Sequence, residues 1–97
     1  MATYQILYWH DIPTQVRVRD AGGRVSAQLP ERFQEAIDQA AMVAGMIGSD
    51  EYTAAFRWGE QQERAGAARE VADAVVAELD AQHPTIDWRA TVAGLKP

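Results

Sequence analysis

Residues 4–20, YQILYWHDIPTQVRVRD, contain two consecutive β-strand patterns. Residues 3–9 are rich in aromatic and β-branched types and contain no turn former, which predicts a strand. Because side chains alternate across a strand, Tyr4, Ile6 and Tyr8 share one face, and the residues on the other face are also mostly apolar. This strand is therefore expected in the centre of a sheet, covered in part on both sides.

The second strand pattern alternates strictly between apolar and polar residues. Within TQVRVR, residues 14–19, Val16 and Val18 fall on one face, while Arg17 and Arg19 fall on the other. This alternation predicts a half-buried strand with one solvated face. The intervening HDIPT segment contains the Asp and Pro typical of a turn, so the two strands are expected to form a hairpin. The DAGG segment that follows is expected to end the second strand, because glycine permits backbone angles that other residues avoid.

Two later segments show the periodicity of amphipathic helices. LPERFQEAIDQAAMVAG, residues 29–45, repeats apolar residues at helical spacing, and Gly45 or Gly48 can provide its C-terminal cap. AAREVADAVVAELDAQ, residues 67–82, carries an apolar stripe of Ala, Val and Leu. Each helix is apolar along one stripe only, so each is expected to cover one face of a sheet.

YTAAFRW, residues 52–58, predicts a third strand. The order β-β-α-β-α predicts an α+β fold, a two-layer sandwich with two helices on one face of the sheet. The sheet is expected to be three-stranded and antiparallel, in the order 2-1-3, like a truncated ferredoxin-like sandwich. Residues 1–83 are expected to form this single domain, and residues 84–97 a C-terminal tail with Trp88 packed back onto it.

Composition limits the class of protein. The 97 residues, 47% of them apolar, predict one folded domain with a core one layer deep. The chain contains no cysteine, which excludes disulfides, thiolate metal sites and cysteine nucleophiles. Its start lacks a signal-peptide pattern, and its longest apolar run, residues 40–48, is too short to span a bilayer. We therefore expect a cytoplasmic protein without membrane insertion.

Charge is distributed unevenly along the chain. The net charge of −5 argues against nucleic-acid binding, which needs a basic surface. Residues 1–30 nevertheless hold three arginines and two aspartates, whereas the remainder holds six basic and twelve acidic residues. The basic part coincides with the predicted hairpin.

The hairpin therefore suggests a binding surface. Arg17 and Arg19, with Arg57 of the third predicted strand, are expected on the sheet face opposite the helices. The first strand is expected to add either its tyrosine set, with Tyr8, or its Leu and Trp set, with Trp9. A guanidinium stacks on aromatic rings and forms forked hydrogen bonds with carboxylates, which suits a protein interface. The first hypothesis is a non-enzymatic module that docks through this face onto a larger cytoplasmic protein with an acidic surface. The alternative is a solvated sheet face with cation–π contacts.

The turn between the two strands provides a second hypothesis. His10 and Asp11 are the one adjacent pair that suggests acid–base chemistry, so Tyr8, His10 and Asp11 could line the site of a small-molecule binder or weak enzyme. A simple turn capped by Asp11 is the preferred explanation of the pair. His10 and His83 are the only histidines and do not indicate a metal site without thiolates, so neither a metal nor a cofactor is expected.

Three segments carry a resemblance to a known family, and they are YWHDIPTQV at 8–16, LPERFQEAIDQAAM at 29–42 and WGE at 58–60. They resemble a small bacterial family named for virulence factors, and the likeness covers about residues 3–82. The family pattern has a serine where this chain has Pro30 and an arginine where it has His10, which weakens a catalytic role for His10. A related domain occurs within a larger conserved virulence factor that carries helical repeats.

The resemblance implies an accessory role. The family supplies no catalytic residues to carry over, and its members occur beside enzymes of corrinoid- and folate-dependent one-carbon metabolism. It thus implies an accessory subunit or scaffold in preference to a stand-alone enzyme. Self-association is expected to be a weak or conditional homodimer, because a two-fold axis through the sheet face would bring Arg17 and Arg19 towards their own copies.

Overall fold

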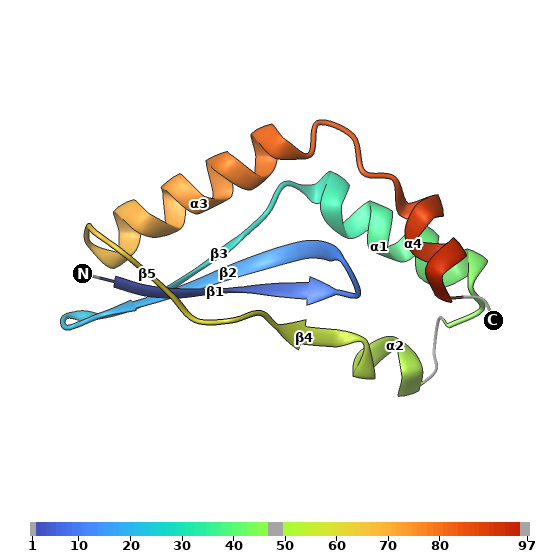
Figure 1. The fold of residues 1–97 in the computed structure, drawn as a ribbon, viewed down its shortest axis with the longest axis horizontal. Helices are drawn as coiled ribbons and strands as arrows, with labels where there is room; N and C mark the ends of the chain where they lie inside the picture. The colour runs from blue at the N-terminus through green and yellow to red at the C-terminus, as the bar shows by residue number, and fades with distance from the viewer. Residues whose placement is uncertain (1, 47–49, 96–97) are drawn as a thin grey trace.

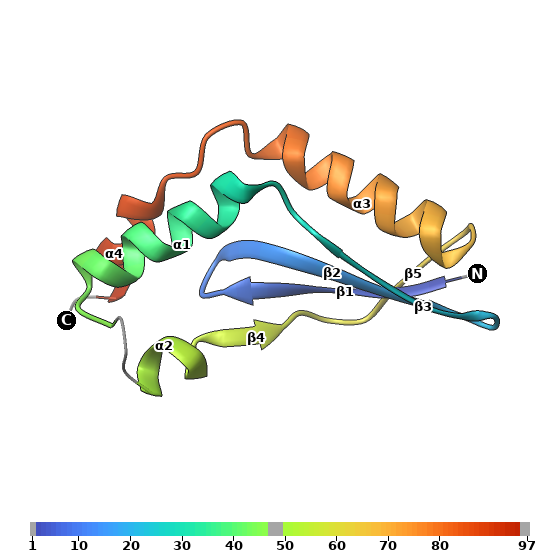
Figure 2. The same cartoon turned by 180° about the vertical axis from the view of Figure 1, so that it is seen from behind.

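The computed structural model describes residues 2–46 and 50–95 and shows an α+β fold with an antiparallel sheet (Figure 1, Figure 2). Its strands are β1 (Ala2–Trp9), β2 (Ile12–Asp20), β3 (Gly23–Gln28), β4 (Phe56–Trp58) and β5 (Gln62–Arg64). Its helices are α1 (Glu31–Val43), α2 (Asp50–Ala54), α3 (Ala68–Gln82) and α4 (Trp88–Leu95).

The sheet has β1 near its centre, as the apolar first strand predicted. The strand order is β3-β2-β1-β4, and β5 pairs with the opposite end of β1. In the β1–β2 hairpin Val16 lies opposite Ile6 and Val18 opposite Tyr4. The α+β class, the antiparallel sheet and the two long helices are confirmed. The three-stranded, ferredoxin-like description is not matched, because the described residues form a sheet of five strands.

The structure contains a strand, β3, that was not predicted from the sequence, and it begins at the second of two glycines. Gly22 and Gly23 do not merely end β2 but turn the chain into a second hairpin, in which Arg19 lies opposite Arg24. The backbone N–H of Gly22 donates to Asp20 Oδ1 at 2.8 Å, and Gly23 has a φ of 150°. A side-chain-capped turn with glycine at the strained position explains why the chain reverses here.

The third predicted strand is shorter than expected. Within residues 52–58 only Phe56–Trp58 is extended, and residues 52–54 belong to α2. Asp50 and Glu51 lie in the first turn of α2, where negative side chains favour the positive end of the helix dipole. A second short strand, β5, then pairs with the start of β1.

The core consists of two clusters. The larger lies between α3 and the helix-facing side of the sheet, where Val16, Val18, Phe33, Val71 and Val75 are buried. The second, which we call the closed end, gathers around Trp9, Ile12, Ile37, Met46 and Val92. Figures 1 and 2 show α1 and α4 on one side of the turn of the β1–β2 hairpin and α2 on the other side. Trp9 and Ile12, which flank the turn, are buried there, whereas Asp11 in the turn is exposed.

Two helix ends show how the chain turns at the borders of the core. At the end of α1 the N–H of Met46 donates to the carbonyl O of Ala41, and the N–H of Gly45 donates to that of Met42. With Gly45 at a φ of 73°, this is a Schellman cap. Gly45 therefore has the predicted role, whereas Gly48 lies outside the described residues. The start of α3 is capped from the β2–β3 hairpin, because Asp20 Oδ2 accepts the N–H of Ala68 at 2.7 Å.

The C-terminal segment is helical and joins the closed end. Trp88, at the start of α4, is partly buried against the second cluster. The Thr91 hydroxyl donates to Asp11 Oδ1 at 2.6 Å, which ties α4 to the turn of the first hairpin. In the part of the chain that the structure describes, no helix has the length and apolarity to cross a membrane.

Candidate functional site

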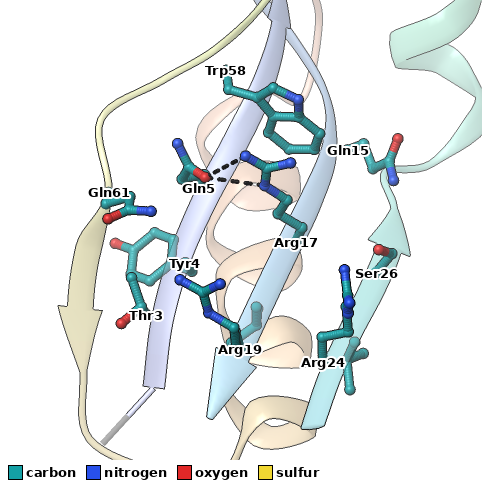
Figure 3. A pocket seen from close by; sticks show the side chains of 12 residues that line it. Thr3, Tyr4, Gln5, Gln15, Arg17, Arg19, Arg24, Ser26, Trp58 and Gln61 are labelled. Carbon is teal, nitrogen blue, oxygen red and sulfur yellow. Dashed lines mark hydrogen bonds between the residues drawn. The ribbon is translucent and has the colours of Figure 1, made fainter.

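The sheet side opposite α3 carries a shallow hollow of about 340 Å³ (Figure 3). Figure 3 looks onto this side, with α3 behind the strands and the side chains of Gln5, Arg17, Arg19 and Trp58 on the side of the viewer. We call it the arginine face and define it by five residues from four strands, namely Gln5, Arg17, Arg19, Arg24 and Trp58.

Arg17 is held at the centre of this face. Its Nε and Nη2 atoms donate to Gln5 Oε1 at 3.0 and 2.6 Å, and its Cζ lies 3.8 Å from the centroid of the Trp58 ring. Gln5 is itself anchored, because its amide nitrogen donates to the carbonyl O of Gly59 at 3.0 Å. The guanidinium is thus fixed by stacking and by a hydrogen-bonded amide, while its residue remains exposed.

Arg19 and Arg24 form a second part of the face. They lie directly opposite each other in the β2–β3 register, and both are exposed. Like charges in opposed positions of a sheet destabilise it. Among residues 2–46 and 50–95, neither of them nor Arg17 has a carboxylate within ion-pair distance. The face therefore carries three uncompensated positive charges in a chain of net charge −5.

The other residues predicted for this surface lie elsewhere. Trp9 is 0% exposed in the closed end, and its indole N–H donates to the carbonyl O of Tyr52 at 3.0 Å. Arg57 pairs with Tyr8 in the β1–β4 register, its Cζ is 5.9 Å from the Tyr8 ring, and Nη2 is 3.5 Å from the carbonyl O of His10. Neither Tyr8 nor Arg57 lines the hollow. Trp9 was misplaced because strand alternation alone does not show that helices enclose the end of the hairpin.

The arginine face also includes three residues that were not predicted from the sequence, namely Gln5, Arg24 and Trp58. Arg24 begins the alternating segment RVSAQ after two glycines, a pattern that predicts a hairpin strand. Trp58 lies opposite Leu7, on the far side of β1 from β2. Its position beside Arg17 had no sequence signal, because it depends on how the short β4 pairs.

The three side chains of the turn hypothesis do not converge on the hollow. His10 has a positive φ of 54°, and its ring packs edge-on against Trp9 at a centroid distance of 4.6 Å. Its Nε2 atom is buried without a hydrogen-bond partner among the residues described. The Asp11 carboxylate accepts a hydrogen bond from Thr91, the Tyr8 ring lies near Arg57, and the His10 ring packs on Trp9, so the three side chains contact different side chains.

The titratable groups of residues 2–46 and 50–95 do not gather into a metal site. The described residues include no group of three or more histidine, aspartate or glutamate side chains that could hold a metal ion. Asp20 is instead used for capping, and the hydrogen bonds from the N–H groups of Ala68 and Gly22 lower the pKa of its carboxyl below the ordinary 3.8. Burial raises the pKa of the Tyr52 hydroxyl above 10.0.

The comparisons with known proteins identify the family of the chain. No curated protein and no solved structure matches it. A family model described as "Virulence factor" matches residues 7–91, which include the last three residues of β1, the elements from β2 to α3 and the first half of α4. The likeness seen in the three sequence segments is thus confirmed over most of the chain, and the protein belongs to the virulence factor family.

Proposed function

We propose that the protein is a non-enzymatic binding module that docks through its arginine face onto an acidic surface of a larger protein. One observation carries this proposal: Arg17, Arg19 and Arg24 share a face without a carboxylate partner among the residues described. Three other arginines, by contrast, each pair with a carboxylate of α3, namely Arg32 with Asp80, Arg64 with Glu78 and Arg69 with Asp73.

The preference for an acidic partner follows from the register of the hairpin. Arg19 and Arg24 repel each other across β2 and β3, and a carboxylate placed between them would remove that repulsion. Guanidinium groups bind carboxylates through paired, charge-assisted hydrogen bonds. Arg17 loses little conformational entropy on binding, because Gln5 and Trp58 already fix it.

A binding module is preferred over a ligand site at the first turn. Tyr8, His10 and Asp11 do not line the hollow of the arginine face, and the Asp11 carboxylate already accepts a hydrogen bond from the Thr91 hydroxyl. The accessory role and the setting in one-carbon metabolism remain part of this proposal through the family resemblance. A cytoplasmic location is proposed with them.

The experiment compares two double variants with the same change in charge. Arg17→Glu with Arg19→Glu reverses the arginine face, whereas Arg57→Glu with Arg89→Glu reverses two arginines that lie over Tyr8 and Trp88. Each protein is titrated with polyglutamate at low and high salt while the three indole N–H signals are followed by NMR. For the wild type we expect the Trp58 signal to shift and that of the buried Trp9 to stay constant, with weaker binding at high salt.

The face variant is expected to lose the Trp58 shift, and the control variant is expected to keep it. Affinity capture from the cells that make the protein then extends the comparison to natural partners, which should be lost with the face variant alone. The proposal is wrong if both double variants bind polyglutamate and the captured partners as the wild type does.

A further inference from the structure

We propose that the free edge of β3, with the groove between this edge and α3, binds an extended acidic segment of the partner as an added strand. This inference rests on the proposed function and names the part of the partner that the protein recognises. Strand addition to a sheet edge beside a helix is a common mode of peptide recognition, in which main-chain hydrogen bonds supply affinity and alternate side chains supply specificity.

The backbone of β3 is arranged for such an addition. β3 ends the strand order of the sheet, and the N–H of Leu29 donates to the carbonyl O of Thr14 at 3.1 Å. In an antiparallel ladder the bonded pairs alternate, so Gly23, Val25 and Ala27 direct their backbone groups towards β2. The residues between them direct theirs away from the sheet, and these are Arg24, Ser26 and Gln28.

A groove of about 560 Å³ lies next to this edge. β3 contributes Ser26, Ala27 and Gln28 to its lining. From α3 come two small apolar residues, Val76 and Ala77, and the charged residues Arg69, Asp73 and Asp80. An added strand would therefore place every second side chain against a narrow apolar strip, which favours small apolar residues at those positions.

The remaining side chains of the added strand would stand on the arginine face. Directly opposed residues in an antiparallel pair point to the same side of the sheet, so those opposite Arg24 and Ser26 join the side that both residues line. A carboxylate there meets Arg24 and the neighbouring Arg19. The expected ligand is thus an extended segment in which acidic and small apolar residues alternate.

A second copy of this chain suits the edge less well. Pairing β3 with its own copy would extend the sheet and add a second set of Arg17, Arg19 and Arg24 to the same side, with no carboxylate to compensate. An acidic segment brings the opposite charge. The edge is therefore assigned to a foreign strand.

The test uses a fluorescein-labelled heptapeptide in which Glu and Val alternate, with a block peptide of the same composition as control. Binding is measured by fluorescence anisotropy for wild type, Ser26→Pro and Ser26→Ala. Proline at 26 removes an outward N–H and leaves the β2–β3 bonds in place, a substitution that edge strands tolerate, whereas alanine keeps the N–H. We expect Ser26→Pro to weaken binding about tenfold and Ser26→Ala to change it less than about twofold.

Hydrogen exchange on the wild type keeps the test independent of the folding of Ser26→Pro. The N–H groups of Arg24, Ser26 and Gln28 should exchange more slowly once the alternating peptide is bound. Unchanged exchange, or equal affinity for the block peptide, would show that charge alone drives binding and would overturn strand addition. A wild-type dimer in sedimentation that Ser26→Pro dissociates would assign the edge to a second copy and would also overturn it.

The two proposals can fail separately. If Ser26→Pro binds the alternating peptide as tightly as the wild type while Arg17→Glu with Arg19→Glu abolishes binding, strand addition is wrong and the binding module stands. If neither polyglutamate nor the alternating peptide binds the wild type, both proposals are wrong.

Discussion

Trp9 lies in β1 and Trp58 in the neighbouring strand β4, but their surroundings differ. Trp9 is 0% exposed, and its indole N–H is bonded inside the closed end. Trp58 is half-buried on the arginine face, where the guanidinium of Arg17 stacks on its ring. A fully enclosed indole contributes mainly apolar burial, whereas a ring under a guanidinium orients a charge. The closed end thus provides stability, and the arginine face provides the surface proposed for recognition.

The largest effect is expected at Trp9. Replacing Trp9 with alanine leaves a cavity between α1 and the segment that contains Tyr52, and should lower the free energy of unfolding by about 3–5 kcal/mol. A domain of this size has a total of about 5–15 kcal/mol, so the variant should be close to unfolded at 37 °C. Urea denaturation followed by circular dichroism measures the change. Trp9→Phe, which keeps most of the apolar volume, should lose less, and equal losses would contradict this account.

A smaller loss is expected from the helix cap of the closed end. Gly45→Ala forces a side chain into the left-handed conformation, where the added Cβ has open space but an unfavourable φ of 73°. The expected destabilisation is about 1 kcal/mol. Gly94 in α4 is the matched control, since its Cβ would also meet open space and its backbone is helical. Gly94→Ala should leave the urea midpoint unchanged or raise it.

The pH dependence of stability is expected to distinguish the contribution of Asp20 from that of the closed end. Because the folded-state pKa of Asp20 is lowered, its carboxylate stabilises the fold fully above the unfolded pKa, and that contribution is lost as pH falls through the folded pKa. Asp20→Asn should therefore lower the thermal midpoint at pH 6, and the difference from wild type should be smaller at a pH below the ordinary carboxyl pKa of 3.8. The loss caused by Trp9→Ala should persist at both pH values. A difference for Asp20→Asn that grows on acidification would reverse the sign and exclude this role.

The smallest effect on stability is expected at Trp58. Trp58→Ala removes the stacking partner of Arg17 and should cost about 1 kcal/mol or less. Its effect on polyglutamate binding should be larger, since Arg17 would lose its fixed position. Trp88 offers a control, because Arg89 lies 4.7 Å over its ring on α4, away from the face. Trp88→Ala should leave polyglutamate binding unchanged, and parallel losses in both variants would contradict a specific role for Trp58.

The sequence predicted those parts of the fold that have strong local periodicity. The stripes of residues 29–45 and 67–82 predicted α1 and α3, and the Val and Arg alternation of residues 14–19 predicted β2. β3 was missed because two glycines also suit the end of a strand, and only pairing with β2 shows that they form a turn. The start of residues 52–58 became helical because the acidic residues before it favour a helix N-terminus.

The candidate site was predictable only where one strand supplies it. Arg17 and Arg19 follow from the alternation of β2, whereas Gln5 and Trp58 reach Arg17 through pairing between distant segments. The alternation of side chains along β1 led to the assignment of Trp9 to an open sheet face. The residues that cover Trp9 come from α1 and from the segment near Tyr52. Such coverage depends on tertiary packing, which local pattern does not encode.

The hydrogen bond between Thr91 and Asp11 joins residues 80 positions apart. During synthesis on a ribosome, the β1–β2 hairpin emerges long before the residue that completes its surroundings. Until residue 91 has left the exit tunnel, Trp9 and Ile12 lack the cover of α4, and the nascent chain presents an apolar end to chaperones and to other chains. The time between these two events sets the period in which a newly made molecule is most exposed to aggregation, and slower translation of residues 50–91 would lengthen it.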